Sequence, residues 1–361
     1  MLLNPNSCLT ARIKINSLHF DFESGAWGCS KRSYMSHQWA VKRLISGICL
    51  SGVMCLSLAR CDIADAQTLE KTRLGISDLS FTFLPHLVAK DTGIFQKHGL
   101  QVELIFIGGP IGTAAMAAGE LNYSASTDSG LPAAVQGVPM KAVLFTMKGP
   151  PFYLISQPAI KKVNDLVGKK VGLSRLGTSP YYASRRIFRK FGVDPDKITY
   201  IQAGSNMNRV LALTNGSLDA SMLSLPTARI MIEKGFTELA SPRDIGFIPH
   251  AGLMARTAII EKNREQVKKT IASLVDAMEY IANNKAKTID YVATKWKLSR
   301  DLSEQLLVRD FVPMLTMDGR MTLQGVQEHL DTEYQNKLIA RRAQASEVMD
   351  LSMLEEVWAK K

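Results

Sequence analysis

The sequence predicts an α/β protein of two lobes, each a mainly parallel sheet flanked by helices, with a helical C-terminal region. From Thr72 onward, short β-rich segments alternate with helical ones, as in parallel sheets built from strand–helix–strand units. The alternation is interrupted at residues 148–151 (KGPP) and then resumes as a second series. From Glu261 onward the pattern is almost wholly helical. An interruption of this kind marks the passage from one domain to another.

The first series contains four expected strands, at residues 73–77, 100–107, 121–126 and 140–147. Between them we expect helices at residues 85–95, 111–118 and 130–136. Each helix meets a glycine that suits a helix C-terminus: Gly93 or Gly99, Gly119, and Gly137.

The second series opens with residues 152–156. Further strands are expected at residues 170–174, 197–202, 218–223 and 236–240, and helices at 181–191, 207–214 and 227–234. Residues 249–260 are expected to form a strand that returns to the first lobe.

This order predicts a first lobe made of residues 67–151 and 244–361, with a second lobe of residues 152–243 inserted between them. We expect hinge segments at residues 148–156 and 239–247, where the chain crosses between the lobes. Pockets favour domain interfaces and the carboxyl ends of parallel strands, so a ligand cleft between the lobes is expected.

The first 66 residues read as an export segment. A basic pair, Lys42-Arg43, precedes the uncharged run 44–59, and Ala64-Asp65-Ala66 supplies the small residues of a cleavage site. We therefore expect a signal peptide at residues 35–66, cleaved near Ala66, with residues 1–34 a mis-assigned upstream extension. The mature protein would then be periplasmic.

Two alternatives remain for this segment. A permanent membrane anchor would need roughly 20 consecutive apolar residues, and the run is shorter and contains serines. A lipoprotein acylated on Cys61 would normally have a small residue before the cysteine, whereas Arg60 stands there.

Composition bounds the chemistry. The chain carries a formal charge of +11, of which the first 66 residues contribute 7 basic and 4 acidic side chains, so the remainder is at +8. A basic surface could suit an acidic ligand, but the charge is scattered, and the densest cluster, residues 185–190, falls on one predicted helix as a solvated face. No stretch alternates basic and aromatic residues, so we expect no nucleic-acid partner.

All five cysteines precede residue 67. The mature chain therefore has no thiol for disulfides, catalysis or metal binding. Its four histidines are not at metal-ligand spacing, so we expect no metal and no cofactor.

Five predicted strands are each followed by small and hydroxyl residues that open a helix. Such openings present unpaired backbone N–H groups and a positive dipole end. The candidate ligand-binding residues at these openings are Asp78, Ser80, Phe81 and Phe83; Gly109 and Thr113; Ser126, Thr127 and Asp128; Arg175, Gly177, Thr178, Ser179 and Tyr181; and Ser205 and Asn206.

Together these openings would wrap a small anionic or strongly polar headgroup. Arg175 is a candidate charge partner, with a surface salt bridge as its alternative role. Phe81, Phe83, Tyr181 and Tyr182 are candidate apolar walls. Taken singly, each opening is also explained as ordinary helix capping.

Four segments carry a family resemblance. They are residues 85–104 (PHLVAKDTGIFQKHGLQVEL), 108–122 (GGPIGTAAMAAGELN), 165–172 (DLVGKKVG) and 212–220 (ALTNGSLDA). In this order they resemble the solute-binding proteins of ABC importers, in the branch that binds nitrate, sulfonates, taurine and thiamine-pyrimidine precursors. The resemblance implies a type II periplasmic binding fold that closes on its solute and delivers it to a membrane permease and ATPase.

The resemblance also carries over ligand loops at residues 78–83, 108–113, 126–128 and 175–179, and adds Ser224 and Pro226. Many relatives are glycine-rich after the third strand, where this chain has Asp128. An acid facing the cleft would accept from an amine or hydroxyl and would repel a simple inorganic anion such as nitrate. The resemblance therefore implies an organic solute that is sulfonate, carboxylate or pyrimidine-like.

No catalytic signature is apparent, since the chain lacks a G-x-S-x-G elbow, a P-loop and an HExxH motif. We expect a monomeric binding protein rather than an enzyme. One alternative is a periplasmic sensor that presents its occupied form to a receptor kinase. Another is a thiamine-pyrimidine biosynthetic enzyme of the same fold, whose cysteine motif is missing after residue 66.

Overall fold

The computed structural model describes residues 68–246 and 248–361. Residues Gln67–Lys361 form one compact unit. The expected signal peptide, upstream extension and Cys61 lie outside the described residues. Within the part that is described, no helix is both long and apolar enough to cross a bilayer.

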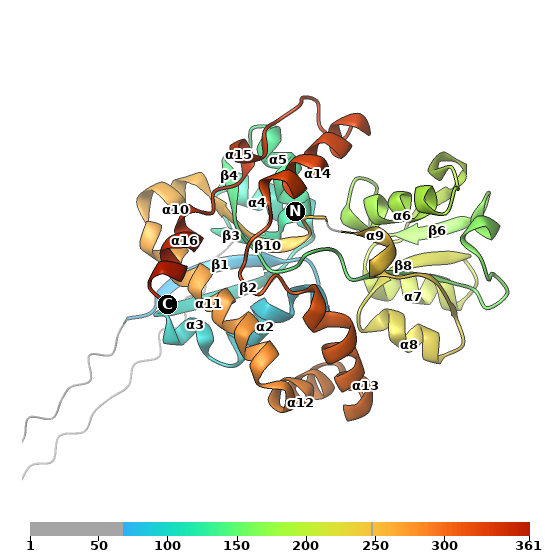
Figure 1. Cartoon of the computed structure of the whole chain (residues 1–361), viewed down its shortest axis with the longest axis horizontal. Coiled ribbons are helices and arrows are strands. Elements are labelled where there is room, and N and C mark those ends of the chain that lie inside the picture. Colours follow the sequence, from blue (N-terminus) through green and yellow to red (C-terminus); the bar gives the residue numbers. More distant parts are fainter. Residues whose placement is uncertain (1–67, 247) are drawn as a thin grey trace, which may run out of the picture. The chain divides into compact units, whose positions relative to one another are not determined.

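The first sheet has the strand order β2-β1-β3-β10-β4 (Figure 1). Its strands are β1 (Glu70–Ile76), β2 (Leu100–Phe106), β3 (Tyr123–Ser126), β4 (Met140–Phe145) and β10 (Ala251–Arg256). β1 pairs in parallel with β2 and β3, whereas β10 is antiparallel to β3 and β4.

The second sheet repeats this plan with the order β7-β6-β8-β5-β9. Its strands are β5 (Phe152–Ser156), β6 (Lys170–Leu173), β7 (Thr199–Gln202), β8 (Ala220–Ser224) and β9 (Thr237–Ala240). β6 is parallel to β7 and β8, and β5 is antiparallel to β8 and β9. We call the halves built on the first and second sheets the first and second lobes.

The antiparallel strand of each sheet is the one that follows a crossing between the lobes. β4 ends at the carboxyl edge of its sheet, and the chain then enters the second lobe at once as β5. A strand that starts from that shared edge has to run away from it, against the direction of its parallel neighbours. β10 does the same on the return. The two mainly parallel sheets confirm the predicted fold class, while the lobe boundaries at residues 151 and 243 stay predictions.

Helices flank both sheets. In the first lobe they are α2 (Leu84–Asp91), α3 (Ile94–Lys97), α4 (Gly109–Ala118) and α5 (Thr127–Val135). In the second they are α6 (Ser179–Lys190), α7 (Asn206–Thr214), α8 (Thr227–Glu233) and α9 (Pro242–Ile245). Helices α2, α4, α5, α6 and α7 begin one to three residues earlier than predicted, and α8 begins at the predicted residue. Figure 1 shows α6 on one side of the second sheet and α7 and α8 on the other.

Two predicted elements need correction. The single helix expected at residues 85–95 is two helices, because Gly93 adopts φ 76° and ends the first of them. The strand expected at residues 249–260 ends at Arg256, and the rest is helix α10 (Thr257–Lys262).

The C-terminal region is helical, as predicted, and packs on the first lobe. It contains α11 (Arg264–Asn283), α12 (Lys285–Trp296), α13 (Arg300–Glu304), a π-helical segment (Gln305–Phe311), α14 (Leu323–Gln335), α15 (Ala345–Val348) and α16 (Ser352–Ala359). α11 packs against α2 and α16 and buries residues such as Ile271, Leu274 and Met278. This burial makes the region part of the lobe's core.

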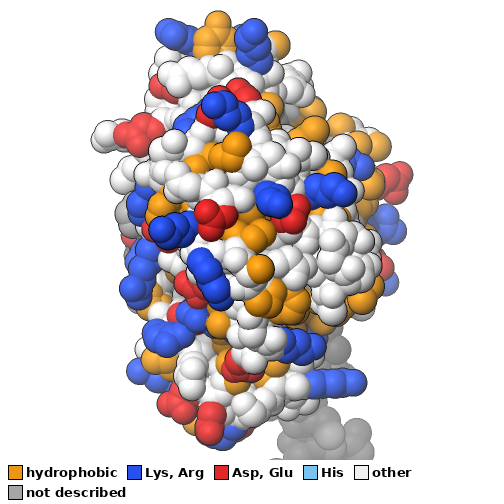
Figure 2. Space-filling model, turned by 90° about the vertical axis from the view of Figure 1, so that its right-hand side faces the viewer, with side chains coloured by type: hydrophobic (Ala, Val, Ile, Leu, Met, Phe, Trp, Pro, Cys, Tyr) orange, Lys and Arg blue, Asp and Glu red, His pale blue; other side chains and the backbone are white. Residues whose placement is uncertain are grey.

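Charge is mixed on the surface of the second lobe. On the face shown in Figure 2, basic and acidic side chains are interspersed with apolar ones. In the basic cluster of α6, Arg185 pairs with Asp196 at 2.6 Å and Lys190 with Asp244 at 2.8 Å. Two of the four basic residues of this cluster are therefore ion-paired on the helix surface.

Candidate functional site

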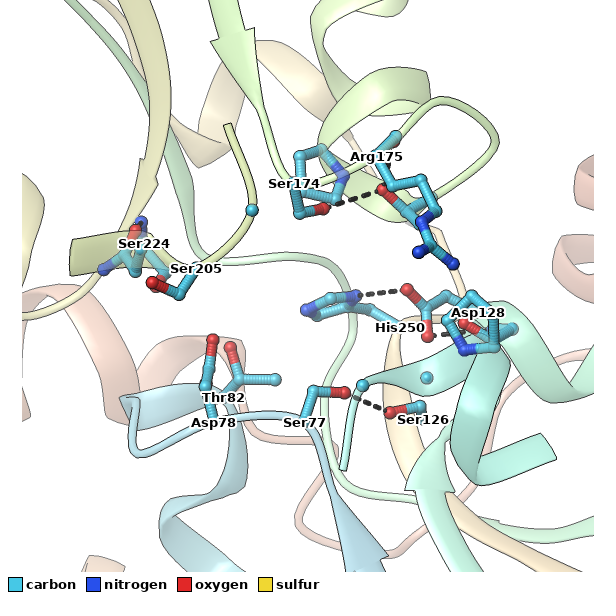
Figure 3. Close-up of a pocket in the computed structure, with 18 of the residues that line it drawn as sticks. Ser77, Asp78, Thr82, Ser126, Asp128, Ser174, Arg175, Ser205, Ser224 and His250 are labelled. Atoms are coloured by element: carbon cyan, nitrogen blue, oxygen red, sulfur yellow. Dashed lines mark hydrogen bonds and ion pairs between the residues drawn. The ribbon is translucent and has the colours of Figure 1, made fainter. Parts of the chain in front are cut away.

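A cavity of about 340 Å³ lies between the two lobes. It opens where the parallel strands of both sheets end, so the loops after those strands form its walls (Figure 3). The first lobe contributes residues after β1, β2 and β3, namely Ser77, Asp78, Gly108, Gly109, Ser126 and Asp128. The second contributes residues after β6, β7 and β8, namely Ser174, Arg175, Thr178, Ser205, Asn206, Arg209 and Ser224.

Helices α4 and α6 are among those that begin at the cavity without a side-chain cap. α4 starts at Gly109, and no side chain accepts from its first N–H groups. α6 starts after Thr178, whose hydroxyl donates instead to the carbonyl of Arg175 at 2.7 Å. α7 differs, since its N-cap Ser205 accepts from the N–H of Asn208 at 3.2 Å. The first two helix ends therefore keep backbone donors available to a polar guest.

Ten of the predicted site residues line the cavity. They are Asp78, Phe83, Gly109, Ser126, Asp128, Arg175, Thr178, Ser205, Asn206 and Ser224. The structure thus brings together residues from all five predicted openings and from the loop added by the resemblance. Their role in holding a ligand stays a prediction.

The other eight are not among the residues that line the cavity, namely Ser80, Phe81, Thr113, Thr127, Gly177, Ser179, Tyr181 and Pro226. Phe81 is fully buried and packs on Trp296, with ring centroids 4.8 Å apart. Thr113 is buried, and its hydroxyl donates to the carbonyl of Gly109 at 3.0 Å. Ser80 and Thr127 are buried as well. In a helical opening only some positions face the cleft, and these side chains point into the core.

Four of these eight residues, Gly177, Ser179, Tyr181 and Pro226, belong to the second lobe. Tyr181 packs edge-on against Tyr182 and Tyr200, with centroids 5.5 and 5.2 Å apart. Pro226 follows a cis peptide bond and caps α8. Gly177 has φ 74°, so a larger residue there would strain the backbone whatever it did to binding. A Gly177 substitution would therefore not separate binding from folding.

Asp128 contacts the second lobe. Its carboxylate accepts from the hydroxyl of Ser179, at the start of α6, and from the backbone N–H of Ser129 at 2.9 Å. The Ser179 hydroxyl also lies 2.8 Å from Nδ1 of His250. Each carboxylate oxygen of Asp128 thus accepts one hydrogen bond, whereas Oδ1 of Asp78 is buried without a hydrogen-bond partner.

His250 is buried where the chain returns to the first lobe. Burial lowers the pKa of His250, against the opposing influence of Asp128 and Asp78, so the neutral imidazole is favoured. With Nδ1–H donating to Ser179, Nε2 is an acceptor, and this buried atom has no hydrogen-bond partner. In a hydrolase triad the histidine stands between the acid and the serine, whereas here the serine stands between the acid and the histidine.

Arg209 is the main site residue that the sequence interpretation missed. It lies in the first turn of α7, lines the cavity and is 3% exposed. Burial lowers its pKa to about 10, partly offset by Asp78, so it is charged at neutral pH. Extending the predicted opening at Ser205 and Asn206 through the first turn of the helix would have included Arg209. His250 and Phe152 also line the cavity, but no strand end or helix opening in the sequence indicated them.

Across residues 68–246 and 248–361, no group of three His, Cys, Asp or Glu side chains could hold an ion.

The fold and sequence have known relatives. A binding protein of Brucella abortus is 28% identical over 250 residues, which cover 64% of this chain and 75% of that protein. The alkanesulfonate-binding protein SsuA of Xanthomonas axonopodis pv. citri, solved with MOPS, superposes with a TM-score of 0.67 at 17% identity, covering 78% of this chain and 98% of that one. The nitrate-binding protein NrtA of Synechocystis PCC 6803 gives 0.68 at 12% identity, covering 81% and 89%.

These structural likenesses show a shared periplasmic binding protein fold. The sequence also matches the family described as NMT1/THI5 like over residues 80–288, which is more than half of the chain. The chain therefore belongs to the NMT1/THI5-like family.

Proposed function

We propose that this chain is the extracytoplasmic solute-binding component of an ABC importer, and that it captures a small polar organic solute by hinge closure. The observation that carries the proposal is the cavity, whose walls come from the strand ends of both lobes. A site divided in this way is complete only when the lobes approach each other, so a bound solute favours the closed state. The Brucella relative, named as a binding protein, and the named functions of SsuA and NrtA support the same assignment.

Contacts between the lobes surround the cavity in the structure. The N–H of Phe81 donates to the carbonyl of Leu225 at 3.2 Å. Ser179 bonds Asp128, and Arg189 donates to Asn336 at 3.0 Å. Arg229 of the second lobe also pairs with Asp310 of the C-terminal region at 3.1 Å, and apolar residues of both lobes, such as Phe81 and Leu225, belong to one buried cluster. The contacts between the lobes are therefore both polar and apolar.

The hinge is proposed at the two crossings. The N–H of Ile248 donates to the carbonyl of Lys148 at 3.2 Å, so the crossings are tied to each other by backbone. β5 and β10, which follow them, are each held inside a sheet and give the hinge two firm ends. Of the expected hinge residues, Phe247 lies outside the described part.

The proposal extends to partners and location. The expected partners are a membrane permease with its ATPase, and the chain would act as a periplasmic monomer after removal of residues up to Ala66. A sulfonate, a carboxylate or a pyrimidine-like compound is the expected solute.

A thermal-shift screen tests the proposal. Sulfonates, aliphatic and aromatic carboxylates and pyrimidines are added to the purified protein, and at least one should raise the melting temperature with concentration, because a ligand that binds only the folded state stabilises it by mass action. Ser174→Trp would fill the cavity and should abolish the shift. Ser217→Trp, exposed in the same lobe, is the matched control and should keep it. The absence of any shift across all these classes would contradict the proposal.

A further inference from the structure

Arg209 presents a buried positive charge to the cavity. Its guanidinium donates to two neutral acceptors, the carbonyl of Gly204 at 3.3 Å and the side-chain oxygen of Asn206 at 3.0 Å. Its Nε is buried without a hydrogen-bond partner. Among the salt bridges formed by the described residues, none involves Arg209. The charge of Asp78 acts on Arg209 without a salt bridge between the two. A buried charge with no bonded counter-ion is costly to a fold.

Asp78 presents the opposite charge from the other lobe. It follows β1, and its Oδ1 is buried without a partner. In Figure 3, Asp78 and Thr82 of the first lobe face Ser205 and Ser224 of the second across the open space. Asp78 interacts electrostatically with Arg209 on the opposite wall, because its negative charge raises the pKa of Arg209 against the effect of burial.

The charged groups that line the cavity balance. Asp78 and Asp128 are acidic, Arg175 and Arg209 are basic, and the pKa of His250 is lowered toward the neutral form. Asp128 is already hydrogen-bonded by Ser179 and Ser129, and Arg175 is exposed to solvent. Among these four charged groups, Asp78 and Arg209 are the two with a buried polar atom that has no hydrogen-bond partner, so a guest has most to satisfy at these two.

A guest of a single charge fits this pair poorly. A simple anion would pair with Arg209 but would leave Asp78 desolvated and facing a like charge. A simple cation would reverse the problem. A molecule that carries both charges satisfies both groups, and the apolar walls from Phe83, Phe152 and Ile111 suit a hydrocarbon spacer between them.

We infer that the cavity selects a zwitterionic solute, with a cationic nitrogen at Asp78, an oxyanion at Arg209 and an apolar spacer between the two. This inference rests on the proposed solute-binding function and narrows its ligand class. It makes Asp78 and Arg209 the specificity-determining residues of the site.

Matched sets of compounds test the inference. Each set keeps one skeleton and varies only the charges: 4-(aminomethyl)benzoate with 4-methylbenzoate and 4-methylbenzylamine, 5-aminopentanoate with pentanoate and pentylamine, and 3-aminopropanesulfonate with propanesulfonate and propylamine. Affinities for the full chain are measured by calorimetry in dilute sodium phosphate, because sulfonate buffers are themselves candidate ligands. In at least one set the zwitterion should bind at least tenfold more tightly than both of its single-charge relatives.

Two variants assign the charges. Asp78→Asn keeps the shape of the side chain and removes its charge. It should lower the affinity for the zwitterion by tenfold or more, while the affinity for the anion of the same set stays the same or rises. Arg209→Gln should also lower the affinity for the zwitterion, while the affinity for the amine of the same set stays the same or rises. Because Arg209 is buried, Arg209→Lys is the second variant, which keeps the charge and should retain most of the preference for the zwitterion. Melting temperatures without ligand verify that each variant is folded.

Several outcomes would overturn the inference. Equal affinity for the zwitterion and the anion in every set would contradict it. An Asp78→Asn variant that lowers the affinities for the zwitterion and for the anion to the same extent would contradict it as well. In either case single-charge compounds still bind, and the proposed function stands. Failure of every compound in these sets and in the broader screen would remove the proposed function as well.

Discussion

At the scale of single residues, Glu333 of α14 is a buried acid. It is 1% exposed, both carboxylate oxygens lack a hydrogen-bond partner, and Nε2 of the buried His329 lies 3.4 Å away. Burial, with a contribution from Asp128, raises the pKa of Glu333 to about 8. Burial also lowers the pKa of His329 to about 3, so both groups are favoured in their neutral forms near pH 7.

This acid predicts a pH dependence. The pKa of Glu333 in the folded chain lies above 4.5, the ordinary value for a glutamate side chain, so the folded state binds its proton more tightly. The resulting stabilisation is complete below about pH 4.5 and is lost as the pH rises through about 8. Glu333→Gln, which mimics the neutral acid, should therefore flatten the fall in the free energy of unfolding between pH 6 and 9, measured by urea denaturation.

The control for this measurement lies on the same helix. Glu328 is exposed, so Glu328→Gln should leave the pH dependence as in the parent chain. If Glu333→Gln retained the full fall with pH, the buried acid would not be its source.

Site residues could be predicted from sequence only in part. Strand ends and helix openings are visible as apolar runs followed by small and hydroxyl residues, which is why Asp78, Gly109 and Asn206 were found. Which side chain of an opening faces the cleft is decided by tertiary packing, and Phe81 and Thr113 turned inward for that reason. His250 joins the site only through the return crossing, a contact across the chain that no local pattern reveals.

At the scale of elements, the two crossings approach each other closely at Gly149. A Cβ on Gly149 would lie 2.8 Å from the carbonyl oxygen of Gly246, which is backbone and has little room to move. The adjacent bond from Ile248 to Lys148 depends on the same approach. The crossing segments are therefore packed on each other, with no side chain between them at this point.

Gly149→Ala should therefore force the crossings apart. We expect a loss of about 1–3 kcal/mol in the free energy of unfolding, as for other overpacked sites. Gly108→Ala is the matched control, since a Cβ there meets nothing within 4 Å and the residue has φ −58°. It should cost less than about 1 kcal/mol. Equal losses in urea unfolding for the two variants would contradict the close approach.

Element types were more predictable than their limits. Each expected strand of the two series is present, because apolar runs bounded by turn residues determine strands locally. Helix starts were predicted late at α5 and α6, since the residues that open them are polar and read as loop. The antiparallel direction of β5 and β10 follows from the crossings, a feature of topology.

At the scale of the whole compact unit, function depends on movement between the lobes. The two lobes are joined by two crossings and share polar and apolar contacts, among them the bond from Phe81 to Leu225 and the bond from Ser179 to Asp128. The two-lobe plan was predictable because Gly and Pro interrupt the alternation at residues 148–151. How closely the lobes approach without a solute depends on small free-energy differences that sequence patterns do not report.

The most direct test of the account is the distance between the lobes with and without solute. Residues 67–361 contain no cysteine, so Ala114→Cys in α4 and Leu176→Cys after β6 place spin labels at two exposed positions, one on each lobe. Pulsed electron paramagnetic resonance then gives the distribution of distances between the labels. A saturating solute found in the thermal-shift screen should shift this distribution to a single shorter distance, and an identical distribution with and without that solute would contradict closure.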